Sequence, residues 1–251
     1  MKKFKALIMD CDGTLILPQR DAMPTPKVTK AIKQASKKLH VGIATQRATP
    51  NTIPIIKHLD LIGPSIVAGG SLIIDSKSLK VIKEEIIDFD SIYQVIKIAK
   101  DYKKYGGPFL IQDSEKGDEE WAESYVIGKP IGLFIGSLSY DLAIELEDKL
   151  SKIPNIAVHK VIPWAGQFGL AVNAALATKQ HGIFEVAKIL GINTHEIIGI
   201  GDSYNDFPLL MACGLKVAMG NAVEELKAIA DYIAPSVEED GIVDVINKFV
   251  L

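Results

Sequence analysis

The chain has 251 residues, 48% of them hydrophobic, and a formal net charge of −3, which together allow one large domain or two unequal domains with an ample core. The mild acidity gives no electrostatic footprint for nucleic acid or an anionic membrane, and no run approaches the ~18–20 apolar residues of a membrane span. The first residues lack the features of a signal peptide, and Cys11 and Cys213 form neither a metal motif nor a disulfide framework. We therefore expect a cytoplasmic protein with reduced thiols, whose oligomeric state the sequence does not indicate.

Strand and helix patterns alternate through the first part of the chain. Short apolar runs predict buried strands, and Thr25-Pro26 is typical of a helix start. The expected elements are a strand at 4–9, a helix from Thr25-Pro26, a strand at 41–44, a helix through 53–59, and a strand at 65–68 that is broken by Gly69-Gly70 and resumes at 72–74.

The same alternation returns near the C-terminus. The expected elements there are helices at 179–190, 223–229 and 242–249 and strands at 197–201 and 215–219. Repeated strand–helix–strand units of this kind predict an α/β fold with a doubly wound, mostly parallel, Rossmann-like sheet covered by helices on both faces.

The middle of the chain breaks this rhythm because strands outnumber helices there. Helices are expected at 91–105 and 142–153, and strands at 86–87, 109–111, 124–127, 133–135, 156–161 and 169–172. This pattern predicts an inserted α+β domain with an antiparallel sheet. We expect a core domain of residues 1–83 and 173–251 and an inserted domain of residues 84–172.

Two carboxylates stand at the end of the first predicted strand. Asp10 and Asp12 are one residue apart, so both can approach one cation, and Gly13 allows the chain to turn sharply behind them. Such close carboxylates repel each other unless a metal ion or a proton neutralises them. An acidic surface turn is the alternative interpretation.

Three further polar signals follow strands or open helices: Thr45, Lys179 and the run Gly201-Asp202-Ser203-Tyr204-Asn205-Asp206. Open α/β sheets bind ligands beyond the carboxyl ends of their strands, where the strand order reverses. If the first strand lies between those ending near Thr45 and Asp202, all the signals converge. Each also has a structural alternative: a helix cap for Thr45, a solvated helix end for Lys179, and helix N-terminal carboxylates for the aspartates.

Together these motifs resemble the haloacid dehalogenase superfamily of aspartate-nucleophile phosphotransferases. The likeness is to its Cof-type, subfamily IIB phosphatases, which carry an inserted α/β cap. The four signals match the family's DxDGT, hydroxyl, lysine and GDxxND motifs in order, and Asn221-Ala222 and residues 231–242 match its closing pattern. The resemblance is weak inside the insert.

The resemblance implies a phosphatase that uses Mg²⁺ and hydrolyses the phosphomonoester of a small metabolite, of the sugar phosphate or phosphoglycolate type, through an aspartyl-phosphate. Asp10 would attack phosphorus, and Asp12 would protonate the leaving alcohol and later accept a proton from water. The metal would be bound by the Asp10 and Asp202 side chains and the Asp12 carbonyl, with Asp206 acting through water. The phosphate or substrate would be held by Gly13, Thr14, Thr45, Gln46, Arg47, Lys179 and Asn205.

The chain departs from the family pattern where Gln46 replaces a glycine, Gln180 follows the lysine in place of a glycine, and Gly69 replaces an asparagine. In the insert, Trp121 and Glu123 are candidate substrate contacts, with packing and solvation as the alternatives. Trp164 is expected to pack, and we assign the histidines no role. The rival functions are a sugar phosphomutase with the same nucleophile and a non-catalytic binding protein of the same fold.

Overall fold

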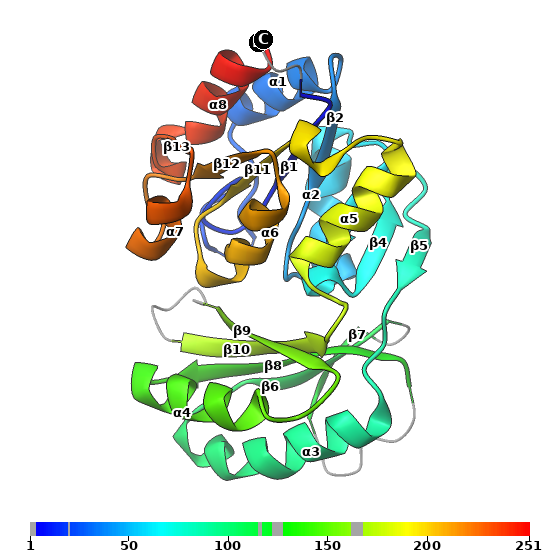
Figure 1. Cartoon of the computed structure of the whole chain (residues 1–251), viewed down its shortest axis with the longest axis vertical. Coiled ribbons are helices and arrows are strands. Elements are labelled where there is room, and N and C mark those ends of the chain that lie inside the picture. Colours follow the sequence, from blue (N-terminus) through cyan, green and yellow to red (C-terminus); the bar gives the residue numbers. More distant parts are fainter. Residues whose placement is uncertain (1–3, 20, 115–116, 122–127, 162–167) are drawn as a thin grey trace.

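A computed structural model describes residues 4–19, 21–114, 117–121, 128–161 and 168–251 (Figure 1). Two sheets lie one above the other in this view, and each is covered by helices. Within the described residues, no helix combines the length and the hydrophobicity needed to cross a membrane.

The first sheet is parallel and has the strand order β13-β12-β11-β1-β2. The central strand β1 (Ala6–Met9) pairs with both β2 and β11, and Met9 lies opposite Ile43 on one side and Ile200 on the other. The carboxyl ends of these three strands are therefore level, and the residues that follow them meet at one edge. The remaining bounds are β2 (His40–Ile43), β11 (Ile197–Gly201), β12 (Leu215–Ala218) and β13 (Tyr232–Ile233).

Helices cover both faces of this sheet, which confirms the predicted doubly wound α/β class. In β1, Leu7 and Met9 join one hydrophobic cluster while Ala6 and Ile8 join another, as expected when a strand is buried on both faces. The first cluster includes residues from α1 (Pro26–Ala35), α2 (Thr49–Leu59) and α8 (Gly241–Phe249), and the second includes residues from α5 (Lys179–Leu190), α6 (Phe207–Ala212) and α7 (Glu224–Ile229).

The chain reverses after β3 instead of resuming the same strand. β3 (Pro64–Val67), β4 (Leu72–Asp75) and β5 (Val81–Glu84) form a small antiparallel sheet. The 3₁₀ turn Ala68–Gly70 makes the reversal, with positive φ at all three of its residues. Two glycines make this turn possible, because glycine adopts positive φ without steric cost.

The second sheet, called the cap sheet here, is antiparallel and has the order β7-β6-β8-β10-β9. Its strands are β6 (Phe109–Asp113), β7 (Gly117–Glu120), β8 (Pro130–Leu138), β9 (Ile156–Val161) and β10 (Phe168–Ala174). The helices α3 (Phe89–Ala99) and α4 (Tyr140–Leu150) cover the face turned away from the parallel sheet (Figure 1), and the hydrophobic side chains of Val95, Leu146 and Leu170 meet beneath them.

Some boundaries in this region differ from the sequence predictions. Residues 86–87 form no strand, the helix predicted to reach residue 105 ends at Ala99 and continues as a 3₁₀ turn, and β10 extends to Ala174. The strand predicted at 124–127 lies outside the described residues. The division into a core domain and an inserted domain at residues 84–172 remains our proposal.

Gly182 sets how closely α5 packs on β3. A Cβ atom at this position would lie 2.8 Å from both Cδ1 and Cγ2 of Ile66, which is itself fully buried. We expect Gly182→Ala to lower the free energy of unfolding by about 1–3 kcal/mol, since overpacking outweighs the better helix propensity of alanine. Urea denaturation monitored by circular dichroism measures this change.

The control is Gly182→Ala combined with Ile66→Ala, which frees the space. The double variant should lose less stability than the two single losses added together. Additive losses would contradict the proposed steric origin.

Candidate active site

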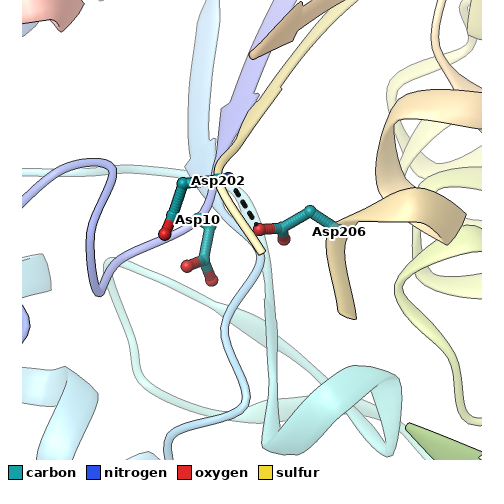
Figure 2. A group of neighbouring side chains, drawn as sticks. All are labelled: Asp10, Asp202 and Asp206. Carbon is teal, nitrogen blue, oxygen red and sulfur yellow. Dashed lines mark hydrogen bonds between the residues drawn. The ribbon is translucent and has the colours of Figure 1, made fainter. Parts of the chain in front are cut away.

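Three aspartates from two strand ends form an acidic cluster beside the parallel sheet (Figure 2). Asp10 follows β1, Asp202 follows β11, and Asp206 ends the 3₁₀ turn Tyr204–Asp206. One carboxylate oxygen from each lies within 4.8 Å of the others. Asp10 and Asp206 are buried and Asp202 is partly buried, so the cluster is a set of desolvated like charges.

The local sequence explains how Asp202 and Asp206 are held. Asp206 Oδ2 accepts hydrogen bonds from the backbone N–H groups of Asp202 (2.9 Å) and Ser203 (3.1 Å), so its carboxylate closes the turn that presents Asp202. Thr14 donates its hydroxyl hydrogen to Asp202 Oδ1 at 2.7 Å. Gly13 has a φ of +80°, and any Cβ atom there would collide with the Asp202 carboxylate.

Lys179 neutralises part of this charge. Its Nζ donates to Asp10 Oδ1 and to Asp206 Oδ1, both at 2.6 Å, and the residue is only 2% exposed. The alternative of a solvated helix-end lysine is therefore wrong. Burial alone would lower the pKa of Lys179, but the negative charges of Asp10 and Asp206 raise it above its ordinary value, so the ammonium group stays charged.

Burial raises the pKa of the two aspartates that follow strands. For Asp10 the pKa rises from 3.8 to about 7, with burial as the largest cause; attraction to Lys179 opposes the rise, and the charges of Asp206 and Asp12 add to it. Burial followed by the charges of Asp206 and Asp10 raises the pKa of Asp202 well above its ordinary value. A cation between these groups would stabilise their ionised forms.

The donor set fits a hard divalent cation. The aspartates of the two acidic motifs carry four negative charges when ionised, against two positive charges from Lys179 and Arg47, so a divalent ion would balance the site. Carboxylate oxygens within 4.8 Å of one another are suitable ligands for such an ion. Asp206 already accepts three hydrogen bonds, which favours an outer position for it.

Asp12 lies outside the three-acid cluster and is paired with Arg47. Arg47 Nε donates to Asp12 Oδ2 at 2.7 Å, and Nη2 donates to Oδ1 at 2.6 Å, which is a bidentate arrangement. The Asp12 side chain is therefore positioned apart from the candidate metal ligands. The sequence predicts that Arg47 binds phosphate, and the structure places its guanidinium on Asp12.

Thr45 lies directly beyond β2 and is 1% exposed. Its Oγ1 accepts the backbone N–H of Arg47 at 3.1 Å, so the hydroxyl fixes the turn that follows. Gln46 Nε2 donates to Asn173 Oδ1 of β10 at 3.2 Å. Asn205 lies partly buried in the turn between Asp202 and Asp206.

Sequence reasoning missed Asn173 and His159, both on cap-sheet strands that carry no recognisable motif. His159 in β9 is partly buried, and burial together with the charge of Lys179 lowers its pKa to about 4, so the imidazole is neutral at pH 7.

Asn221 stands out in the sequence only as part of the closing pattern. Its Nδ2 donates to the Gly13 carbonyl at 2.8 Å, and its Oδ1 accepts from Val237 N–H at 2.9 Å.

The cap candidates need a correction. Trp121 is 4% exposed in the hydrophobic core of the cap sheet, where it stacks on Phe109 with ring centroids 6.1 Å apart and has Lys103 Nζ over its ring. Packing explains its position, so Trp121 is no longer a candidate substrate contact. Glu123 and Trp164 lie outside the described residues.

Cys11, between Asp10 and Asp12, is fully buried. Burial and the neighbouring charges of Asp10 and Asp12 raise the pKa of its thiol well above 9.0. The thiol is therefore protonated at neutral pH.

A family model for haloacid dehalogenase-like hydrolases matches residues 7–117 and 122–246 of the chain. The chain is also 26% identical over 248 residues to a 5-amino-6-(5-phospho-D-ribitylamino)uracil phosphatase of Bacillus subtilis, covering 98% of this chain and 96% of that protein. It is 25% identical over 253 residues to phosphoglycolate phosphatase 1 of Saccharolobus solfataricus, covering 97% and 95%.

Solved structures show the same architecture. The structure of a sugar phosphatase of subclass IIB superimposes with a TM-score of 0.80 at 26% identity and covers 98% of each chain. A haloacid dehalogenase-like hydrolase from B. subtilis superimposes with a TM-score of 0.81, at 19% identity, covering 97% of this chain and 99% of that one.

The stabilisation of the folded protein by a divalent cation should increase with pH. A carboxyl whose pKa rises from 3.8 in the unfolded chain to about 7 in the metal-free fold favours folding below pH ~4, and this contribution is lost as the pH rises through about 7. A cation binds the ionised carboxylates instead. We expect the rise in Tm on adding MgCl₂, relative to EDTA, to grow by several degrees between about pH 5 and pH 7.

Differential scanning fluorimetry measures this dependence. Asp202→Asn should abolish most of the MgCl₂ effect. Asp60→Asn, which removes an exposed carboxylate paired with Lys33 at 2.6 Å, is the matched control and should retain it. A shift in Tm that does not vary with pH would contradict the assignment of the cation to these carboxylates.

Proposed function

Because the chain belongs to the haloacid dehalogenase-like hydrolase family and is a phosphatase of that family, we propose that it hydrolyses the phosphomonoester of a small metabolite with Mg²⁺ as cofactor. The observation that carries this proposal is the convergence of Asp10 and Asp202 within reach of one cation, with Lys179 bonded to the same Asp10 carboxylate. A sugar phosphate or phosphoglycolate type of substrate is supported by the names of the relatives.

Asp10 is the proposed nucleophile. One of its carboxylate oxygens attacks phosphorus while the bond from phosphorus to the leaving alcohol oxygen breaks, which gives an aspartyl-phosphate. Lys179 fixes the orientation of this carboxylate, and its charge offsets the negative charge of the phosphoryl group. Mg²⁺ bound by Asp10 and Asp202 would neutralise further charge at the same place. Thr45 would hold a phosphoryl oxygen. The backbone N–H groups of Gly13 and Thr14, which the sequence also offered for this role, instead donate to the carbonyls of Ile16 (2.8 Å) and Cys11 (3.3 Å).

Asp12 is the proposed general acid and base. It donates a proton to the leaving alcohol oxygen, and its carboxylate then takes a proton from the water that attacks phosphorus, which restores Asp10 and releases phosphate. The position of the Asp12 side chain outside the acidic cluster supports a role in proton transfer over direct metal ligation. Arg47 donates to both oxygens of this side chain, which fits the ionised carboxylate that accepts the proton from water. The acid step would need one of these oxygens released from Arg47 to carry the proton.

Asp10→Asn should lower the release of phosphate from p-nitrophenyl phosphate at least about 10³-fold, because an amide does not form the covalent intermediate. The variant should still fold, since Lys179 keeps its ion pair with Asp206 at 2.6 Å. Phosphate release and Tm are measured on the same preparation, with Asp60→Asn as the control that keeps activity. Retained turnover in Asp10→Asn would refute the assigned nucleophile.

The loss of activity in Asp12→Asn should depend on the leaving group of the substrate. An alkyl alcohol needs protonation as it leaves, whereas p-nitrophenolate does not. We expect kcat/KM to fall at least about tenfold further for an alkyl phosphate, such as glycerol phosphate, than for p-nitrophenyl phosphate. Equal losses for both esters would contradict the role of Asp12 as the acid.

The alternative function, a phosphomutase, predicts different products from those of a phosphatase. A mutase would isomerise a sugar phosphate in the presence of a sugar bisphosphate and release little phosphate. Screening purified protein with Mg²⁺ against phosphorylated metabolites, with both phosphate and isomer measured, distinguishes the two reactions.

A further inference from the structure

The Gln46 side chain links the turn after β2 to the cap sheet. Its Nε2 donates to Asn173 Oδ1 at 3.2 Å, and Asn173 is fully buried at the end of β10. Asn173 Nδ2 in turn lies within hydrogen-bonding distance of Ala68 O (3.1 Å), Ser71 Oγ (3.0 Å) and Ile131 O (3.0 Å). This one amide therefore joins two cap strands, the turn after β3 and Gln46.

Gly69 provides the space for this link. A Cβ atom at residue 69 would lie 2.5 Å from Gln46 Oε1 and 2.8 Å from Asn173 Oδ1, which is closer than real Cβ contacts. Gly69 also has a φ of +71°. Residue 69 therefore has to be small while residue 46 carries its long amide.

Gln46 and Gly69 are two of the positions at which the chain departs from the pattern that it resembles. There a glycine stands at position 46 and an asparagine at position 69, whereas here the long amide stands at 46 and the glycine at 69. The two departures occupy the same space in the structure, so they compensate each other. An amide side chain is thus present at position 46 here and at position 69 in the pattern.

The turn that carries Gln46 also carries two groups of the active site. Gly69 N–H donates to the Thr45 carbonyl and Ala68 N–H donates to the Arg47 carbonyl, both at 2.9 Å. Thr45 follows β2, whose last residue Ile43 pairs with Met9 next to Asp10, and Arg47 holds Asp12. A displacement of residue 46 would therefore move the neighbours of both reactive aspartates.

We propose that Gln46 and Asn173 form a positioning pair, which ties the Thr45–Arg47 turn to cap strand β10 and depends on Gly69 for its space. Gln46 acts through Thr45 and Arg47, and its amide donor is engaged by Asn173 and not by phosphate. The kinetic part of this inference rests on the proposed phosphatase function, whereas the packing part does not.

The packing test is a double-mutant cycle in which Tm is measured for Gln46→Gly, Gly69→Asn and the double variant. Gly69→Asn should lower Tm by about 4 °C or more through overlap with Gln46 and Asn173, and the double variant should recover the part of that loss that comes from Gln46. Gly191→Asn is the matched control, because Gly191 also has positive φ (+65°) and nothing lies within 4 Å of the point that a Cβ atom would occupy there. A loss for Gly69→Asn no greater than for Gly191→Asn, or additive losses in the cycle, would overturn the proposal.

The kinetic test uses Gln46→Met, which keeps the length of the side chain and removes the donor. We expect kcat/KM for p-nitrophenyl phosphate to fall about tenfold while Tm stays within about 2 °C of the parent protein. In the cycle above, Gln46→Gly and the double variant both lack the amide donor of residue 46, so both should lose activity at least as much as Gln46→Met. Unchanged kinetics in Gln46→Met would overturn the positioning role.

Failure of this inference is distinguishable from failure of the proposed function. If the parent protein hydrolyses phosphate esters and the cycle is additive, the function stands and the positioning pair is refuted. If the parent protein hydrolyses no phosphate ester, the proposed function fails, and the Tm values of the cycle still decide whether Gln46 and Gly69 are coupled.

Discussion

The site depends on Lys179, which neutralises part of the charge of three desolvated carboxylates at the carboxyl edge of the parallel sheet. Asp10 and Asp206 both accept from its Nζ at 2.6 Å, and without it the cluster would hold only repelling charges. Removing one partner of a buried ion pair typically costs about 3–5 kcal/mol. The carboxyl ends of β1, β2 and β11 lie level, which brings the carboxylates after β1 and β11 together at this edge. The fold therefore determines the electrostatics of the site.

Much of the fold follows from local patterns in the sequence. β1, β9, β11 and α5 lie where the apolar periodicity predicts them, because each combines a clear period with a clear stop such as Gly191. The convergence of Asp10 and Asp202 follows from strand order once β1 is central. These features are encoded within a few residues or by a general rule of open sheets.

The features that the sequence did not predict depend on contacts between distant segments. The pairing of Arg47 with Asp12 spans 35 residues, and the reversal at Ala68–Gly70 needs three successive positive φ angles that a strand pattern does not reveal. Trp121 resembles a recognition residue by composition, whereas its burial against Phe109 is a matter of tertiary packing. Asn173 belongs to no recognisable motif, because its four hydrogen-bonding neighbours are distant from it in the sequence.

The burial of Cys11 has a consequence for resistance to oxidants. Peroxides attack thiolates at exposed positions, and this sulfur is neither ionised at neutral pH nor in contact with solvent. The residue that separates Asp10 from Asp12 is therefore a poor target for sulfenic acid formation. Oxidative stress should leave this thiol unmodified while the protein is folded.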